Sequence, residues 1–171
     1  MSSSQQQKRV VLYGDGRRVD VMHAIEQVVP LLRERADVIH VCTDRVLDLS
    51  RVEADLLINF GGDGSILGSV RSMQHNQIPI VGVNFGKVGF LTAFELPDLL
   101  VSLDAILGDD LPRQQSTILD ATLIRKSGET RKFLAVNDAV VSRSAKSRLV
   151  SLRLSIDDHY VHFTIYLSKI H

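Results

Sequence analysis

The chain has 171 residues, 44% of them hydrophobic, so it is long enough to bury one full core and part of a second. Lys plus Arg and Asp plus Glu each number 20, which gives a formal net charge of zero. This balance offers no overall attraction to nucleic acid or to a membrane surface, and we expect neither as a partner. The single cysteine, Cys42, excludes a disulfide framework within the chain and predicts a reducing, cytoplasmic compartment.

Residues 1–8 form the first segment. They are rich in Ser and Gln and lack the apolar stretch of a secretion signal. No segment of the chain approaches the roughly 18 consecutive apolar residues of a membrane span. We therefore expect residues 1–8 to be a disordered tail.

Strand and helix patterns then alternate. Apolar runs predict strands at 9–13, 37–42, 56–60 and 79–84. The first predicted helix follows the first strand and has its apolar face at Met22, Ile25, Val29 and Leu32. Two further helices are predicted at 65–73 and 96–107. Pro30 is expected to kink the first helix or shift its start. Strands that alternate with helices imply a parallel sheet with right-handed crossovers.

The sequence pattern changes from Ser116 onward. Partly alternating strands are predicted at 117–125 and 131–136 with a turn at 127–129, and β character continues through 140–141, 149–156 and 160–166. About 55 residues is short for a complete sandwich. The predicted fold class is therefore α/β, with an open parallel α/β sheet domain at 9–112 followed by an incomplete antiparallel β-sandwich-type domain at 113–171.

The most informative segment is residues 58–65, which read INFGGDGS. Asp63 lies among glycines where an apolar run ends and a helical pattern begins, and such glycines allow close approach to a ligand. The helix N-terminus that follows suits an anionic phosphate. The lysine of a Walker A loop and the spacing of the dinucleotide fingerprint are both absent, which leaves Asp63 as the chemical group. The alternative is that Asp63 only caps the helix.

A second glycine-rich loop, residues 82–92, reads GVNFGKVGFLT and follows the next strand. Loops at neighbouring strand ends of a parallel sheet form a crevice. The alternative is that Phe85, Phe90 and Leu91 only bury the underside of a long turn.

Other polar groups have equally ordinary alternatives. Asn137 and Asp138 end an apolar strand, as turn residues often do. Arg148 belongs to a basic run that resembles a solvated face. His159 and His162 point to opposite faces of a strand, so we expect no metal site built from protein residues.

Three segments in order, 61–65, 82–92 and 137–138, closely resemble the NAD kinase family, and the resemblance covers about 10–158. The first motif, 61–65, is shared with phosphofructokinases and with diacylglycerol and sphingosine lipid kinases. The second motif, 82–92, is the one that narrows the resemblance to the NAD kinase family. The resemblance implies transfer of the γ-phosphoryl group of ATP to the 2′-hydroxyl of the adenosine ribose of NAD, which makes NADP. It also implies NAD and ATP as ligands and a divalent metal such as Mg²⁺ as cofactor. We further expect a homo-oligomer.

The resemblance also implies roles for individual residues. Asp63 would be the catalytic base that orients or deprotonates the 2′-hydroxyl. Gly62 and Gly64 would let the substrate come close, and Phe90 would pack on the adenine side of the crevice.

The remaining implied substrate contacts come from the later segments. Asn137 and Asp138 would hydrogen-bond the other nucleoside, and Arg148 would lie near the substrate.

The chain departs from the family in its last part. Family members continue into a Gly-Ser-Thr-Ala-Tyr type segment that grips the diphosphate, but here all 11 glycines lie at or before Gly128. We therefore expect a C-terminally truncated or altered chain with little activity of its own. The alternatives are another kinase with the same glycine-Asp turn, such as a phosphofructokinase or lipid kinase, and a non-catalytic nucleotide-binding module.

Overall fold

The computed structural model describes residues 7–44, 46–87, 89–108, 111–136, 138–140 and 153–161. The chain divides into two compact units, Met1–Asn137 and Asp138–His171. The domain boundary expected after residue 112 stays a prediction.

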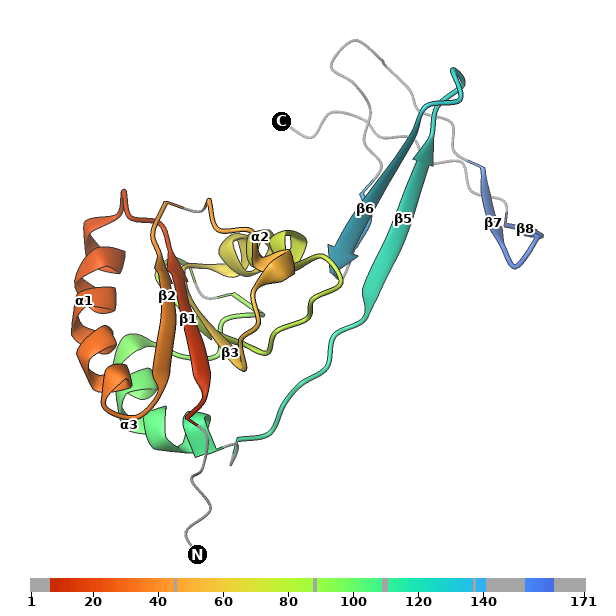
Figure 1. Ribbon diagram of the computed structural model, residues 1–171. Helices are drawn as coiled ribbons and strands as arrows, with labels where there is room; N and C mark the ends of the chain where they lie inside the picture. The colour runs from red at the N-terminus through yellow and green to blue at the C-terminus, as the bar shows by residue number, and fades with distance from the viewer. Residues whose placement is uncertain are drawn as a thin grey trace, which may run out of the picture. The chain divides into compact units, whose positions relative to one another are not determined.

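A four-stranded parallel sheet forms the centre of the first unit (Figure 1). Its strands are β1 (Arg9–Gly14), β2 (Asp37–Cys42), β3 (Leu56–Phe60) and β4 (Ile80–Val83), in the order β2-β1-β3-β4. The predicted parallel sheet is therefore confirmed. The chain moves outward from β1 to β2 on one side and from β3 to β4 on the other, so the topology switches between β1 and β3. Ligands of open α/β sheets bind outside the carboxyl ends of the strands at such a switch.

Helices cover both faces of this sheet: α1 (Val19–Arg33) and α3 (Leu96–Gly108) on one face, α2 (Asp63–Met73) on the other (Figure 1). The layering follows from the two-residue period of a strand. Val10 and Leu12 of β1 pack in the cluster that contains α1 and α3, whereas Val11 and Tyr13 pack with Met73 of α2. In the part of the chain that the structure describes, no helix is long and apolar enough to cross a membrane.

The buried face of α1 differs from the predicted one. Ile25 and Leu32 are buried as expected, but Met22 and Val29 are only half-buried. The other buried positions of the helix are Val21, Ala24 and Val28. Apolar residues occupy more than one stripe along the helix. Their spacing is therefore compatible with burial of either of two neighbouring faces. The helix also continues through Pro30 to its end at Arg33.

Antiparallel hairpins follow the α/β part, as the fold class predicted. Strands β5 (Ile118–Ile124) and β6 (Thr130–Val136) pair across a turn in which Gly128 has a φ of +84°. In the second unit, β7 (Leu154–Ile156) pairs with β8 (His159–Val161). Val140 and Arg153 were also predicted to have β character, but neither lies in a strand. The remaining predicted strand positions, 141, 149–152 and 162–166, lie outside the described residues.

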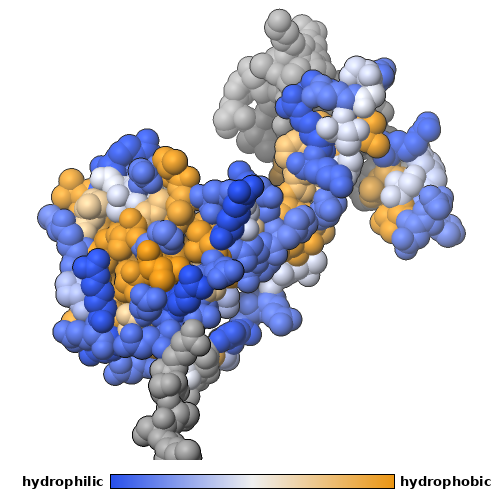
Figure 2. Space-filling view, viewed as in Figure 1, coloured by the Kyte–Doolittle hydropathy of each residue, from blue (hydrophilic) through white to orange (hydrophobic). Residues whose placement is uncertain are grey.

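Strand β2 is an edge of the parallel sheet, and Figure 2 shows apolar surface over this edge. Val41 is exposed there, while Cys42 is buried and donates a hydrogen bond to Asp44 Oδ1 at 3.4 Å. The interpretation of Cys42 as a small buried side chain is confirmed.

Candidate functional site

The turn after β3 is fixed to the end of β4 by main-chain hydrogen bonds. Gly61 N donates to Val83 O at 2.9 Å, and Phe85 N donates to Gly61 O at 3.4 Å. A Cβ on Gly61 would come within 2.6 Å of Ser65 Cβ, so the first glycine of the turn is required by packing against the helix. The turn therefore has a set position at the carboxyl ends of two neighbouring strands.

Asp63 is the first residue of α2, but its side chain does not cap that helix. The N-cap is Gly62, and no side chain makes a cap hydrogen bond there. The Asp63 carboxylate instead accepts hydrogen bonds from the second glycine-rich loop, at 2.9 Å from Phe90 N to Oδ2 and at 3.0 Å from Leu91 N to Oδ1. The alternative in which Asp63 only caps the helix is therefore wrong.

These main-chain donors set the charge state of Asp63. The Phe90 amide above all, then the Leu91 amide and to a smaller extent the Thr92 amide, hold the pKa of the carboxyl below its ordinary value, against a partial opposing effect of burial. Hydrogen bonds from amides favour the ionised form of a carboxyl. Asp63 is thus a carboxylate at neutral pH, half-buried and held by its neighbours.

The second loop folds back over the end of β4. Ala93 N and Phe94 N donate to Gly82 O at 3.2 and 3.1 Å, and Asn84 N donates to Phe94 O at 2.7 Å. Asn84 shapes the loop through its side chain, which accepts from Gly86 N and donates to Glu95 Oε1, both at 3.0 Å. The two loops predicted to form a crevice therefore lie together.

The aromatic residues of the second loop behave differently from each other. Phe85 is half-buried against the core, with its ring centroid 6.1 Å from that of Phe60. The Phe90 side chain is fully exposed beside the Asp63 contact. Burial of the underside of the turn therefore accounts for Phe85 and not for Phe90, which stays available to a ligand.

Gly62 and Gly64 differ from the other glycines of the site. A Cβ at either position would meet no atom within 4 Å, and neither residue has a positive φ. At Gly82, by contrast, a Cβ would lie 2.5 Å from Ile66 Cδ1. Neither packing nor backbone conformation requires glycine at 62 and 64. Their lack of a Cβ instead enlarges the open space beside Asp63.

A buried polar group that the sequence analysis missed lies under the turn. Asn59, wholly buried in β3, donates to Ser69 Oγ at 2.6 Å, and Ser69 Oγ donates to Ser65 O at 3.2 Å. Asn59 Oδ1 has no hydrogen-bond partner among the described residues. The signal was present in the sequence, because Asn59 is a polar residue inside an otherwise apolar strand.

The structure brings together Asp63, Gly62, Gly64 and Phe90, while the later predicted residues are not placed with them. Asn137 and Arg148 lie outside the described residues. Asp138 is exposed and belongs to the second compact unit, so its role beside Asp63 stays a prediction.

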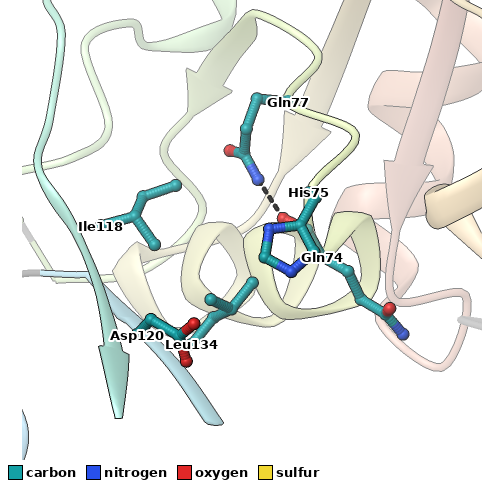
Figure 3. Close-up of a pocket in the computed structure, with 6 residues that line it drawn as sticks. All are labelled: Gln74, His75, Gln77, Ile118, Asp120 and Leu134. Carbon is teal, nitrogen blue, oxygen red and sulfur yellow. Dashed lines mark hydrogen bonds between the residues drawn. The ribbon is translucent and has the colours of Figure 1, made fainter. Parts of the chain in front are cut away.

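A separate open pocket of about 210 Å³ lies at the other end of α2 (Figure 3). The side chain of Gln77 donates to the carbonyl of Gln74 there, and Ile118 and Leu134 of the hairpin line the opposite side. The volume is below the roughly 300–1,000 Å³ of typical ligand sites. At about 1.5 Å per residue, the length of α2 separates this pocket from Asp63 by about 16 Å. It is therefore distinct from the candidate site.

Comparison with known proteins gives consistent matches. Residues 13–111 match the family model of the ATP-NAD kinase N-terminal domain. The NAD kinase of Heliobacterium modesticaldum is 35% identical over 133 residues, which are 78% of this chain and 46% of the relative. The NAD kinase of Desulforamulus reducens is 32% identical over 140 residues, 81% of this chain and 49% of the relative. The chain thus spans about half the length of these curated relatives.

A solved structure shares the fold. The crystal structure of yeast NADH kinase complexed with NADH superimposes with a TM-score of 0.62 at 16% sequence identity, over 77% of this chain and 47% of that one. The α/β architecture with following antiparallel strands is thereby confirmed as one that a known kinase adopts.

Proposed function

Because the chain belongs to the NAD kinase family, we propose that it serves the transfer of the γ-phosphoryl group of ATP to the 2′-hydroxyl of the adenosine ribose of NAD, which makes NADP. The observation that carries this proposal is the turn at the end of β3. There an ionised Asp63 stands beside Gly62 and Gly64, at which a Cβ would meet only open space. The relatives named NAD kinase and the NADH bound to the yeast enzyme support the choice of a nicotinamide dinucleotide.

Asp63 would act on the attacking hydroxyl. A carboxylate has about four lone-pair sites, and two of them are used by the Phe90 and Leu91 amides. The remaining sites can accept the 2′-hydroxyl of the ribose and aim its oxygen at the phosphorus. Proton abstraction is most efficient when the pKa of the base is near the operating pH. The lowered pKa of Asp63 therefore favours orientation of the hydroxyl over its early deprotonation.

Substrate binding would involve both glycine-rich loops. Gly62 and Gly64 would allow the ribose and phosphates to approach the main chain, and the exposed ring of Phe90 would contact the adenine. Asn137 and Asp138 would hydrogen-bond the other nucleoside, and Arg148 would lie near the substrate; these contacts rest on the family motif alone.

A divalent metal such as Mg²⁺ would enter as a companion of ATP. Within the described residues no group of three or more His, Cys, Asp or Glu gathers that could hold a metal. Mg²⁺ in kinases is bound mainly by substrate phosphates and water with one or two carboxylates. The metal would supply charge neutralisation on the transferred phosphoryl group.

The test is a substrate comparison with the purified protein. ATP and Mg²⁺ are offered with NAD, fructose 6-phosphate or diacylglycerol, and phosphate incorporation is measured. We expect incorporation into NAD and into neither of the other acceptors, at a low rate, because little activity is expected of this chain on its own. Incorporation into either of the other acceptors would assign the chain to another glycine-Asp kinase, and calorimetric NAD binding without incorporation would indicate a nucleotide-binding module.

The proposal also covers the oligomeric state of the protein and its cellular compartment. We expect a homo-oligomer in the cytoplasm, where ATP and NAD are available. Light scattering on the eluting peak of a size-exclusion column tests the oligomer, and a mass equal to one chain would contradict it.

A further inference from the structure

Gly89 of the second loop lies directly against the side chain of Asp63. A Cβ built on Gly89 would overlap the Asp63 carboxylate, with Asp63 Cγ only 2.5 Å away. Real Cβ atoms do not make contacts this short. No side chain can therefore occupy position 89 while the Asp63 carboxylate stays in place.

This contact is by itself enough to require glycine at 89. The crowded group is also the end of a short side chain and not main chain. An alanine at 89 would therefore displace the carboxylate rather than the main chain.

We infer that Gly89 is a positioning residue for Asp63. By lacking a Cβ it lets the main chain of residues 89–91 lie against the carboxylate, so that the amides of Phe90 and Leu91 hold it in one orientation. The inference rests on the proposed function, because the Asp63 carboxylate is the group that would aim the 2′-hydroxyl.

Two observations support this role. The carboxylate makes both hydrogen bonds to residues 27 and 28 positions later in the chain, so the second loop fixes a group that belongs to the first. The same amides lower the pKa of Asp63, with the Phe90 amide making the largest contribution. The pKa of Asp63 is therefore a direct report on whether the loop holds the carboxylate.

The experiment follows the Asp63 carboxyl resonance by NMR as a function of pH in the 171-residue chain. Gly89→Ala is compared with Gly86→Ala, a control in the same loop whose Cβ would come no closer than 4.0 Å to its nearest neighbour, Asn84 Oδ1. We expect the pKa of Asp63 to rise toward the ordinary 3.8 in Gly89→Ala and to stay low in Gly86→Ala. An unchanged low pKa in Gly89→Ala would overturn the inference.

A second measurement decides the matter if Gly89→Ala does not fold. In Asp63→Asn the charged acceptor is lost, and we expect the Phe90 and Leu91 amides to exchange their hydrogens about tenfold faster or more than in the unsubstituted chain. Unchanged exchange at both amides would overturn the inference. Neither readout requires turnover, so phosphate transfer to an acceptor other than NAD would refute the proposed function and leave these results to judge Gly89 separately.

Discussion

The buried side chain of Asn59 donates to Ser69 Oγ at 2.6 Å, which ties the strand that ends in the Asp63 turn to the helix that begins with it. Ser69 Oγ in turn donates a hydrogen bond to the carbonyl oxygen of Ser65 in the first turn of α2. The strand and the helix on either side of the glycines are thus joined beneath the site as well as through the main chain.

This contact predicts a measurable coupling. Asn59→Ala should lower the free energy of unfolding by about 1–3 kcal/mol, because it removes a buried hydrogen bond and leaves a small cavity. In a double-mutant cycle with Ser69→Ala, urea unfolding should give a coupling energy of about 0.5–1.5 kcal/mol. Strictly additive effects of the two substitutions would show that the contact contributes nothing to stability.

Substitution of the glycines of the turn should have two different effects, loss of stability at one position and loss of ligand binding at another. Gly64→Ala should leave stability unchanged or raise it by up to about 1 kcal/mol, because alanine is the better helix former and its Cβ meets no neighbour. The same variant should bind NAD or ATP more weakly. The matched control, Gly61→Ala, should lose about 1–3 kcal/mol of stability, because its Cβ would collide with Ser65.

Urea unfolding and calorimetry on the same two variants provide the check. Normal nucleotide affinity in Gly64→Ala would mean that the space beside Asp63 is not used by a ligand.

Much of this architecture could be predicted from the sequence because it depends on local patterns. The apolar run of β3 and the glycines after it specified a strand, a turn and a helix, and β2 begins and ends at the predicted residues. The buried face of α1 could not be chosen, because neighbouring apolar stripes differ only in how they meet the sheet. The hairpin turn at Asp157 and Asp158, with φ values of +48° and +63°, was also missed, since such turns usually carry glycine.

The site was only partly predictable for a similar reason. The glycine-rich segments indicated that Asp63 and Phe90 lie near a crevice. The pairing of Asp63 with the Phe90 and Leu91 amides could not be foreseen, because it joins main-chain groups far along the sequence, and hydrogen bonding to main chain leaves no residue-type signature. Asn59 was overlooked because its apolar neighbours dominate the strand pattern.

The held carboxylate predicts a pH dependence of stability. A pKa lowered in the folded state means that Asp63 stabilises the fold above its unfolded pKa, near 3.8, and that this contribution is lost as the pH falls through the lower folded value. The difference in melting temperature between the unsubstituted chain and Asp63→Asn should therefore be largest near neutral pH and shrink below about pH 4. A difference that grows on acidification would contradict the sign of the shift.

Asn137 and Asp138 carry a prediction from the family motif. The paired alanine substitution should weaken NAD binding, with each lost hydrogen bond worth about 0.5–1.5 kcal/mol. Calorimetric titration with NAD measures the change. Unchanged affinity together with a lower melting temperature would show that the pair only forms a turn.

The most direct test of the account is the rate of ATP-dependent NADP formation by Asp63→Asn, compared with the unsubstituted sequence in a form of the protein that phosphorylates NAD. Asparagine keeps the size of the side chain but removes the charge that would hold the hydroxyl. We expect kcat to fall by about 10²–10⁴-fold, the typical contribution of a positioned acid or base. A variant that retains most of its kcat would remove Asp63 from the chemistry and contradict the central claim.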